Sequence, residues 1–191
     1  LEKRLNSCGK PFPGIEVRIS NPENPSEVLG ANQKGEIQIR GYSLFEGYYK
    51  DEEATQNAMT DDGWYRSGDL GALDEDGYLS YLGRWKDMLK IGGENVAALE
   101  IESHINTHPD VILSQVVGIE DERYDEVAAV FIEAVPGANV SSQDIIDYCK
   151  GQISNFKIPR YVVFVNEWPM SATKIQKFKL KSFDLGEKYS P

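Results

Sequence analysis

The segment Tyr65–Leu70 holds a carboxylate in a position from which it could bind a ligand. Asp69 comes directly after Gly68, and a glycine frees the backbone to bring the next side chain close to another molecule. A carboxylate so placed can accept hydrogen bonds from both neighbouring hydroxyls of a ribose. Because a Gly-Asp pair is more often part of a simple turn, the pair alone is weak evidence for a nucleotide site.

The stretch from Gly83 to Val96 is a more specific signal. It reads GRWKDMLKIGGENV and combines charged side chains with the double glycine Gly92-Gly93. A Glu-Ile-Glu run, which we expect on a helix, follows at 100–102, and these features rarely coincide by chance. The two glycines could leave room for a ligand, or they could simply form a tight turn before the helix.

Histidine and cysteine residues offer no convincing metal site. His104 and His108 lie four residues apart on a predicted helix, a spacing that can chelate zinc. No glutamate follows His104, however, and the sequence shows no third ligand. Cys8 and Cys149 are far apart and belong to no pairing motif. We therefore predict no metal site and no disulfide.

The first part of the chain has the pattern of β-hairpins. Short alternating runs separated by Gly, Asp and Asn turns fill residues 14–84. One helix is predicted from Asp51 to Met59, because the acidic residues 51–53 favour the positive end of a helix dipole. The predicted strands are Glu16–Ser20, Glu36–Arg40, Trp64–Arg66 and Tyr78–Leu82.

Strands and helices alternate in the second part, so we predict a domain boundary at residues 84–87. Ser141 and Asp144 have the spacing of a capping box, which starts a helix. Helices are predicted at Ala98–His108 and Ser141–Ile153, and strands at Val111–Ile119, Val127–Val135 and Tyr161–Val165. The sequence therefore predicts an α+β fold in two domains, 1–84 and 85–191.

The charge of the chain limits its partners. A net charge of −11 argues against nucleic acid, which requires a basic footprint. Residues 150–191 nevertheless hold 8 Lys and Arg against 3 Asp and Glu, so this end could serve an anionic ligand or be a solvated Lys-rich surface. No run of about 18 apolar residues occurs. We expect a cytoplasmic protein without a membrane span.

Several motifs together resemble the superfamily of adenylate-forming enzymes, which includes acyl-CoA synthetases, peptide-synthetase adenylation domains and beetle luciferases. The likeness covers nearly the whole chain and is strongest in residues 83–96. Gly92–Val96 and Lys177–Leu180 are most similar to acyl-CoA synthetases. The other motifs are Gly35–Gly41, Gly47-Tyr48-Tyr49, Asp62-Gly63-Trp64, Ser67–Leu70 and Phe156–Pro159.

The resemblance implies a fold and a boundary. Residues 1–84 would form the β-rich, distorted barrel-like end of a large domain. Residues 85–191 would form a small, mobile AMP-binding domain, with a three-stranded sheet and flanking helices. Lys86 falls at the family's hinge, where a change in backbone dihedrals rotates the small domain. Without the surrounding motif, Lys86 would be interpreted as an exposed linker lysine.

The resemblance also assigns the nucleotide and CoA contacts. Asp69 and Arg84 would hold the ribose hydroxyls of ATP or AMP, since the planar guanidinium offers several donors at once. Gly92, Gly93 and Glu94 would line the passage for the pantetheine arm of CoA. A glycine backbone leaves space there that a side chain would obstruct.

Lys174 matches the family's catalytic lysine, whose ammonium offsets negative charge where a carboxylate meets the α-phosphate of ATP. The family has a glycine before this lysine, but here Thr173 precedes Lys174 directly. This difference puts the reach of Lys174 in question. Lys177 is the alternative, and a surface lysine without a role is the remaining interpretation. The acidic run Asp121–Glu126, in which Asp125 replaces a usual glycine, is interpreted as solvated surface.

The implied reaction activates a carboxylic acid, fatty acids being favoured, with ATP to an acyl-adenylate and then transfers the acyl group to CoA. The chain lacks the Ser/Thr/Gly-rich phosphate loop and an acyl pocket, so we interpret it as a carboxy-terminal portion that is inactive alone. Mg²⁺ would be held mainly by the missing portion. Whether the full-length enzyme forms a homodimer stays open. The alternatives are a peptide-synthetase adenylation domain, a luciferase-like oxidase and a non-catalytic interaction module.

Overall fold

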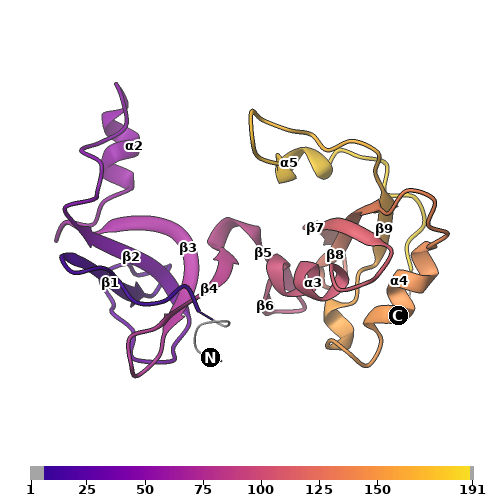
Figure 1. Cartoon of the computed structure of the whole chain (residues 1–191), viewed down its shortest axis with the longest axis horizontal. Coiled ribbons are helices and arrows are strands. Elements are labelled where there is room, and N and C mark those ends of the chain that lie inside the picture. Colours follow the sequence, from indigo (N-terminus) through magenta and orange to yellow (C-terminus); the bar gives the residue numbers. More distant parts are fainter. Residues whose placement is uncertain (1–6, 190–191) are drawn as a thin grey trace. The chain divides into compact units, whose positions relative to one another are not determined.

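A computed structural model describes residues 7–189 of the chain. The chain forms two compact units, Leu1–Lys86 and Asp87–Pro191, and their elements are labelled in Figure 1. The division falls two residues after the end of the predicted first domain. Both units are rich in β-strands and carry few helices, which confirms the predicted α+β class. Among the described residues, no helix is both long and apolar enough to cross a membrane.

The first unit contains one antiparallel sheet with the strand order β1-β2-β3-β4. The sheet is open within residues 7–189, since β1 and β4 occupy its two ends. Its buried side chains include Ile19, Ile37 and Leu70. The strands are β1 (Ile15–Ser20), β2 (Gly35–Gly41), β3 (Tyr65–Leu73) and β4 (Leu79–Arg84), and the helix is α2 (Glu52–Asn57).

Strand β3 is longer than the sequence predicted. The prediction ended the strand at Arg66 because Ser67-Gly68-Asp69 has the composition of a turn, yet the strand continues to Leu73. Gly68 makes this continuation feasible, because its φ of +68° lies in a region that other residues rarely adopt. Asp69 consequently lies inside a strand, where its direction is fixed by pairing with β4.

The second unit contains a five-stranded sheet with β8 at its centre. Strand β7 pairs with one edge of β8, and β5 and β9 pair with the other. The strands are β5 (Met88–Ile91), β6 (Glu94–Ala97), β7 (Val111–Asp121), β8 (Asp125–Ala134) and β9 (Tyr161–Phe164). The helices are α3 (Ala98–Ile105), α4 (Ser142–Cys149) and α5 (Lys177–Leu180), with short 3₁₀ turns η1 (Trp85–Asp87) and η2 (Asn155–Lys157).

The predicted three-stranded sheet is therefore too small, because the β5–β6 hairpin adds two strands. Each strand of this hairpin has only four residues, too few for a clear alternating pattern. The capping box of α4 is present as predicted, with Ser141 and Asp144 bonded to each other in both directions. Helix α3 ends at Ile105 and helix α4 at Cys149, so both are shorter than predicted.

Strand β8 separates two apolar clusters. Its side chains alternate between the two faces, and every residue from Val127 to Ile132 is buried. Helices α3 and α4 cover the face of Ala128, Val130 and Ile132. The segment after β9 covers the other face. The second cluster consists of Val117, Ala129, Phe131, Val165 and Leu180.

The interpretation of residues 121–126 as solvated surface is wrong for Asp121. Its side chain is only 6% exposed and forms an ion pair with Lys188. It also accepts hydrogen bonds from the backbone N–H groups of Arg123 and Tyr124. The Lys188 ammonium, with these two donors, holds the pKa of Asp121 below its usual value. Asp125 has a φ of +62°, which explains why a glycine would suit this position.

Candidate functional site

Asp69 and Arg84 come together as direct neighbours on two paired strands. They are Cα partners in the register of β3 and β4, and Arg84 Nε lies 2.9 Å from Asp69 Oδ1. Their side chains are 35% and 43% exposed, respectively, so a ligand can reach both. Arg84 Nη2 also donates to the carbonyl oxygen of Ser67 at 3.1 Å. The arrangement presents an oriented carboxylate beside a fork of donors, which suits a pair of vicinal hydroxyls.

A short hydrogen-bond chain fixes the backbone that carries Asp69. The hydroxyl of Ser67 donates to the carbonyl of Ile37 at 2.7 Å and accepts from the Asp69 N–H at 3.0 Å. Ser67 thereby ties the Gly68-Asp69 backbone to the neighbouring strand β2. A fixed backbone lowers the entropy that a bound ligand would otherwise have to remove.

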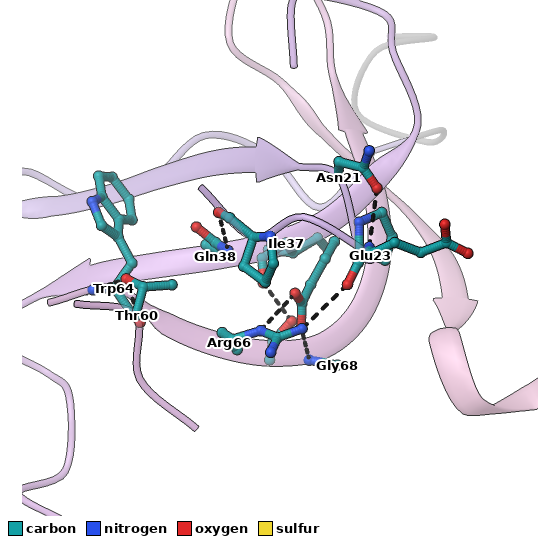
Figure 2. A network of polar contacts seen from close by, with 12 residues as sticks. Asn21, Glu23, Ile37, Gln38, Thr60, Trp64, Arg66 and Gly68 are labelled. Atoms are coloured by element: carbon teal, nitrogen blue, oxygen red, sulfur yellow. Dashed lines mark hydrogen bonds and ion pairs between the residues drawn. The ribbon is translucent and has the colours of Figure 1, made fainter. Parts of the chain in front are cut away.

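Glu36 is a second support for this segment, and the sequence analysis did not identify it as part of the site. Its side chain is only 5% exposed. It accepts from Arg66 Nε at 3.0 Å and from the Gly68 N–H at 3.2 Å. Arg66 reaches further to the carbonyl of Pro22 at 3.3 Å, and Figure 2 shows Arg66 and Gly68 in this network. The buried carboxylate thus holds the residue directly before Asp69.

Aromatic side chains lie beside the same pair. Phe45 packs edge-to-face against Tyr48 and Tyr65, with centroid distances of 4.9 and 5.3 Å. Burial raises the pKa of Tyr65, and hydrogen bonding with Tyr48 and the negative charge of Asp69 act in the same direction. Tyr65 is therefore a neutral phenol at physiological pH. Its sequence context carries no sign of a role in the site, because an aromatic residue in a strand is more often a packing residue.

Lys86 lies in η1 and is the last residue of the first unit. Its side chain is exposed. The structure thus places Lys86 at the boundary between the two units, and its role as a pivot stays a prediction.

Gly92 and Gly93 form the turn of the β5–β6 hairpin. Their φ angles are +59° and +84°, the combination that tight two-residue hairpin turns require. A Cβ added at Gly93 would meet no atom within 4 Å, so open space lies beside this backbone. Glu94 begins β6 and is exposed. The local turn explains both glycines, and the same turn leaves an unobstructed surface.

Lys174 is exposed near the tip of a small hairpin. Met170 and Ile175 form an isolated antiparallel bridge. The Ser171 N–H donates to the carbonyl of Lys174 at 2.8 Å, and the Ser171 hydroxyl accepts from the Lys174 N–H at 3.3 Å. No residue from 171 to 174 has a positive φ. The turn therefore closes without the glycine that the family has before this lysine.

Lys177, the alternative to Lys174, has a different position. Its ammonium lies 2.5 Å from Glu102 Oε1, and the Glu102 side chain is 7% exposed. A lysine held by a buried carboxylate is less available to a ligand than an exposed one. The geometry favours Lys174 as the cation that a ligand could meet.

His104 and His108 both pack against the ring of Tyr148. The ring is stacked on His104 at 4.9 Å and edge-on to His108 at 4.8 Å. Within residues 7–189, no group of three His, Cys, Asp or Glu side chains could hold a metal ion.

The predicted residues fall into separate groups. Asp69 and Arg84 share one site in the first unit, whereas Gly93 and Lys174 belong to the second. Gly93 connects β5 to the end strand β6, while Lys174 precedes α5, which contacts the opposite end strand β7. The second unit therefore carries its glycine turn and its lysine on different elements.

Comparison with known proteins agrees with this fold. The model of the AMP-binding enzyme C-terminal domain matches residues 100–174, and that of the AMP-binding enzyme matches residues 1–49. The chain belongs to the AMP-binding, adenylate-forming enzymes and matches a carboxy-terminal portion of them.

Individual relatives are acyl-CoA synthetases. The chain is 46% identical over 180 residues to the putative acyl-CoA synthetase YngI of Bacillus subtilis, covering 94% of this chain and 33% of the relative. It is 41% identical over 182 residues to the mitochondrial medium-chain acyl-CoA ligase ACSF2 of Bos taurus, covering 95% and 29%. The chain thus spans about a third of the length of these relatives.

A solved structure with the same fold is o-succinylbenzoate CoA synthetase (MenE) from Bacillus subtilis, in complex with its acyl-adenylate intermediate. The TM-score is 0.88 at 30% identity, over 99% of this chain and 38% of MenE.

Proposed function

We propose that this chain is the carboxy-terminal part of an AMP-forming acyl-CoA synthetase, which joins a carboxylic acid to CoA through an acyl-adenylate. The observation that carries the proposal is the Asp69–Arg84 pair, fixed on adjacent strands yet open to a ligand. The similarity of the chain to YngI and ACSF2 supports acyl-CoA ligation in particular.

The pair binds the ribose of ATP and later of AMP. Asp69 accepts from the two ribose hydroxyls, and Arg84 orients the carboxylate through the contact at 2.9 Å. Glu36 and Ser67 hold the backbone of this segment in place. The ribose is unchanged in both steps, so a site on a rigid sheet can bind it throughout the reaction.

Lys174 serves the first step. A carboxylate oxygen of the acid attacks the α-phosphorus of ATP, the bond to the bridging oxygen breaks, and pyrophosphate leaves. The Lys174 ammonium, exposed on its hairpin, lowers the repulsion between the carboxylate and the phosphate as they approach. Mg²⁺ is expected to neutralise the phosphates in the full-length enzyme. We assign it no ligand within residues 7–189, where no suitable group of side chains occurs.

The glycine turn serves the second step. The thiolate of CoA attacks the carbonyl carbon of the acyl-adenylate, the bond from that carbon to the phosphate oxygen breaks, and AMP leaves. The pantetheine arm passes the open backbone of Gly93. The exposed Glu94 lies directly after this glycine. Gly93 and Lys174 lie on different elements of the second unit, and each serves only one step, so we infer that the unit turns between the steps. Lys86 provides the pivot.

Separate assays of the two steps in the full-length enzyme test the proposal. Lys174→Ala should abolish pyrophosphate release from ATP and a medium-chain or long-chain acid, while thioester formation from pre-made acyl-adenylate continues. Asp69→Asn should instead raise the KM for ATP, because it weakens ribose binding in both steps. Equal loss of both steps in Lys174→Ala would remove Lys174 from its role.

The acceptor can be tested in the same system. Because the relatives are CoA ligases, CoA should accept the acyl group from the adenylate. Transfer only to a carrier protein would indicate a peptide-synthetase-type enzyme instead. The inactivity of residues 1–191 alone and the cytoplasmic location stay predictions, as does the possible homodimer of the full-length enzyme.

A further inference from the structure

The hairpin that carries Lys174 is closed at its base and tied to the fold on both sides. The N–H of Gln176 donates to the carbonyl of Pro169 at 2.8 Å, which closes the base. The residues directly outside this base are Trp168 and Lys177. Each of them uses its side-chain nitrogen to contact a carboxylate on a regular element of the second unit.

The first tie joins the hairpin to helix α3. Lys177 Nζ lies 2.5 Å from Oε1 of Glu102. The same carboxylate oxygen accepts the N–H of Val116 at 2.7 Å. Strand β7 is the end strand of its sheet, so Val116 has no neighbouring strand on that side and Glu102 supplies the missing acceptor. The lysine therefore binds a carboxylate that is already fixed by a strand.

The second tie joins the hairpin to the central strand of the sheet. Trp168 Nε1 donates to Glu133 Oε2 at 2.6 Å. Glu133 lies in β8, which is paired on both edges and contains a run of buried residues. A side chain on such a strand is a firm support, since strand movement would break hydrogen bonds to its neighbours.

Apolar contacts support both sides of the hairpin as well. Leu180, three residues after Lys177, is fully buried in the second cluster, and Trp168 packs against the same cluster. The two sides of the hairpin therefore rest on one apolar surface. The polar contacts of Lys177 and Trp168 orient the hairpin on this surface, because a hydrogen bond has a preferred angle whereas apolar packing does not.

We propose that Glu102 and Glu133 are positioning residues that fix the direction of Lys174 through Lys177 and Trp168. The inference rests on the proposed role of Lys174 in adenylation. Lys174 itself lies in a tight turn closed by Ser171, so an orientation imposed at the base is carried to the tip. Loosening either tie should lower the rate of adenylation and leave thioester formation unchanged, since the second step does not use Lys174.

One variant of the full-length enzyme tests each tie. Glu102→Gln keeps an oxygen to accept the Val116 N–H but loses the charge that holds Lys177. Trp168→Phe keeps an aromatic ring in the cluster but loses the N–H donor. The matched control is Glu100→Gln on the same helix. Glu100 contacts Lys157 at 2.5 Å and has no contact with the hairpin among those described.

We expect Glu102→Gln and Trp168→Phe each to reduce the adenylation kcat about 10-fold or more, because misplacing a reacting group by about 1 Å can cost about 100-fold. Thioester formation from pre-made acyl-adenylate should stay within about twofold of the parent enzyme, as should both steps in Glu100→Gln. Lys177→Arg preserves the charge and should retain most of the adenylation rate. Trypsin should cleave after Lys174 faster in Glu102→Gln than in the parent enzyme.

Each contrary result has a distinct meaning. Equal loss of both steps in Glu102→Gln would show a general structural role and would overturn the inference. Unchanged adenylation in both variants would overturn it as well. Lys174→Ala in the same assays separates the two levels. If Lys174→Ala abolishes adenylation while the tie variants do not, only the positioning role fails. If Lys174→Ala stays active in adenylation, the catalytic role of Lys174 fails and the positioning role fails with it. The proposed function itself fails only if the parent enzyme forms no acyl-adenylate from ATP and any carboxylic acid tested.

Discussion

Among the charged residues described in the first unit, Glu36 should be the one whose substitution lowers stability most, because its carboxylate is buried. Glu36→Ala removes the acceptor of two donors, Arg66 Nε and the Gly68 N–H. Removing one partner of a buried ion pair costs about 3–5 kcal/mol. The Arg66 side chain is 31% exposed, so water can solvate part of its charge in the variant. We therefore expect the free energy of unfolding of the first unit to fall by about 2–4 kcal/mol.

Hydrogen exchange measured residue by residue in the 191-residue chain can test this value, because it reports each unit separately. Amides of β2 and β3, such as Ile37, should exchange faster in Glu36→Ala, and so should Gly68. Amides in β8 should keep their protection. Glu36→Gln retains one acceptor oxygen and should lose roughly half as much stability.

The control for this experiment is Glu16→Gln, in the same sheet. Glu16 pairs with Arg40, but both side chains are exposed, at 57% and 43%, so the substitution should have no measurable effect. A change below about 1 kcal/mol for Glu36→Ala, or an equal loss of protection in both units, would contradict the assignment of Glu36 as the support of the Gly68-Asp69 segment.

Three further predictions concern other parts of the chain. A bidentate contact with Arg18 lowers the pKa of Asp62 from 3.8 to about 2; a lowered folded-state pKa gives stability that is complete above about pH 4 and disappears towards pH 2, so Asp62→Asn should weaken the acid dependence of the urea midpoint over that range. Burial raises the pKa of Cys149 to about 11, so a thiol reagent at pH 8 should modify Cys8 alone in the native chain and both cysteines in denaturant. Gly93→Ala should destabilise the β5–β6 hairpin by about 1–2 kcal/mol, because a φ of +84° is unfavourable for alanine, and thermal unfolding should report the loss.

Local signals in the sequence predicted local structure well. The capping box at Ser141 depends on residues three positions apart, and it is present. Strands β7 and β8 were predicted from their long apolar runs, which are typical of central strands, and both are present. Asp69 and Arg84 are near enough in sequence for one hairpin to bring them together.

Contacts between distant residues could not be predicted in this way. Glu36 meets the N–H of Gly68 across 32 positions, and Lys177 meets Glu102 across 75. A glutamate in a strand or helix carries no local sign that it will be buried and paired, since its burial depends on where another element passes. The β5–β6 hairpin was missed for a different reason, because four residues per strand are too few to distinguish a strand from a loop.

The side chains that face the free side of β7 have a consequence for association between molecules. The outward N–H of Val116 is occupied by Glu102, and that of Ser114 by the amide oxygen of Asn106 at 2.7 Å. A strand from another molecule could pair there only by displacing both side chains, one of which carries a buried charge. The middle of this edge strand is therefore protected from β-augmentation and from the aggregation that an uncapped strand invites.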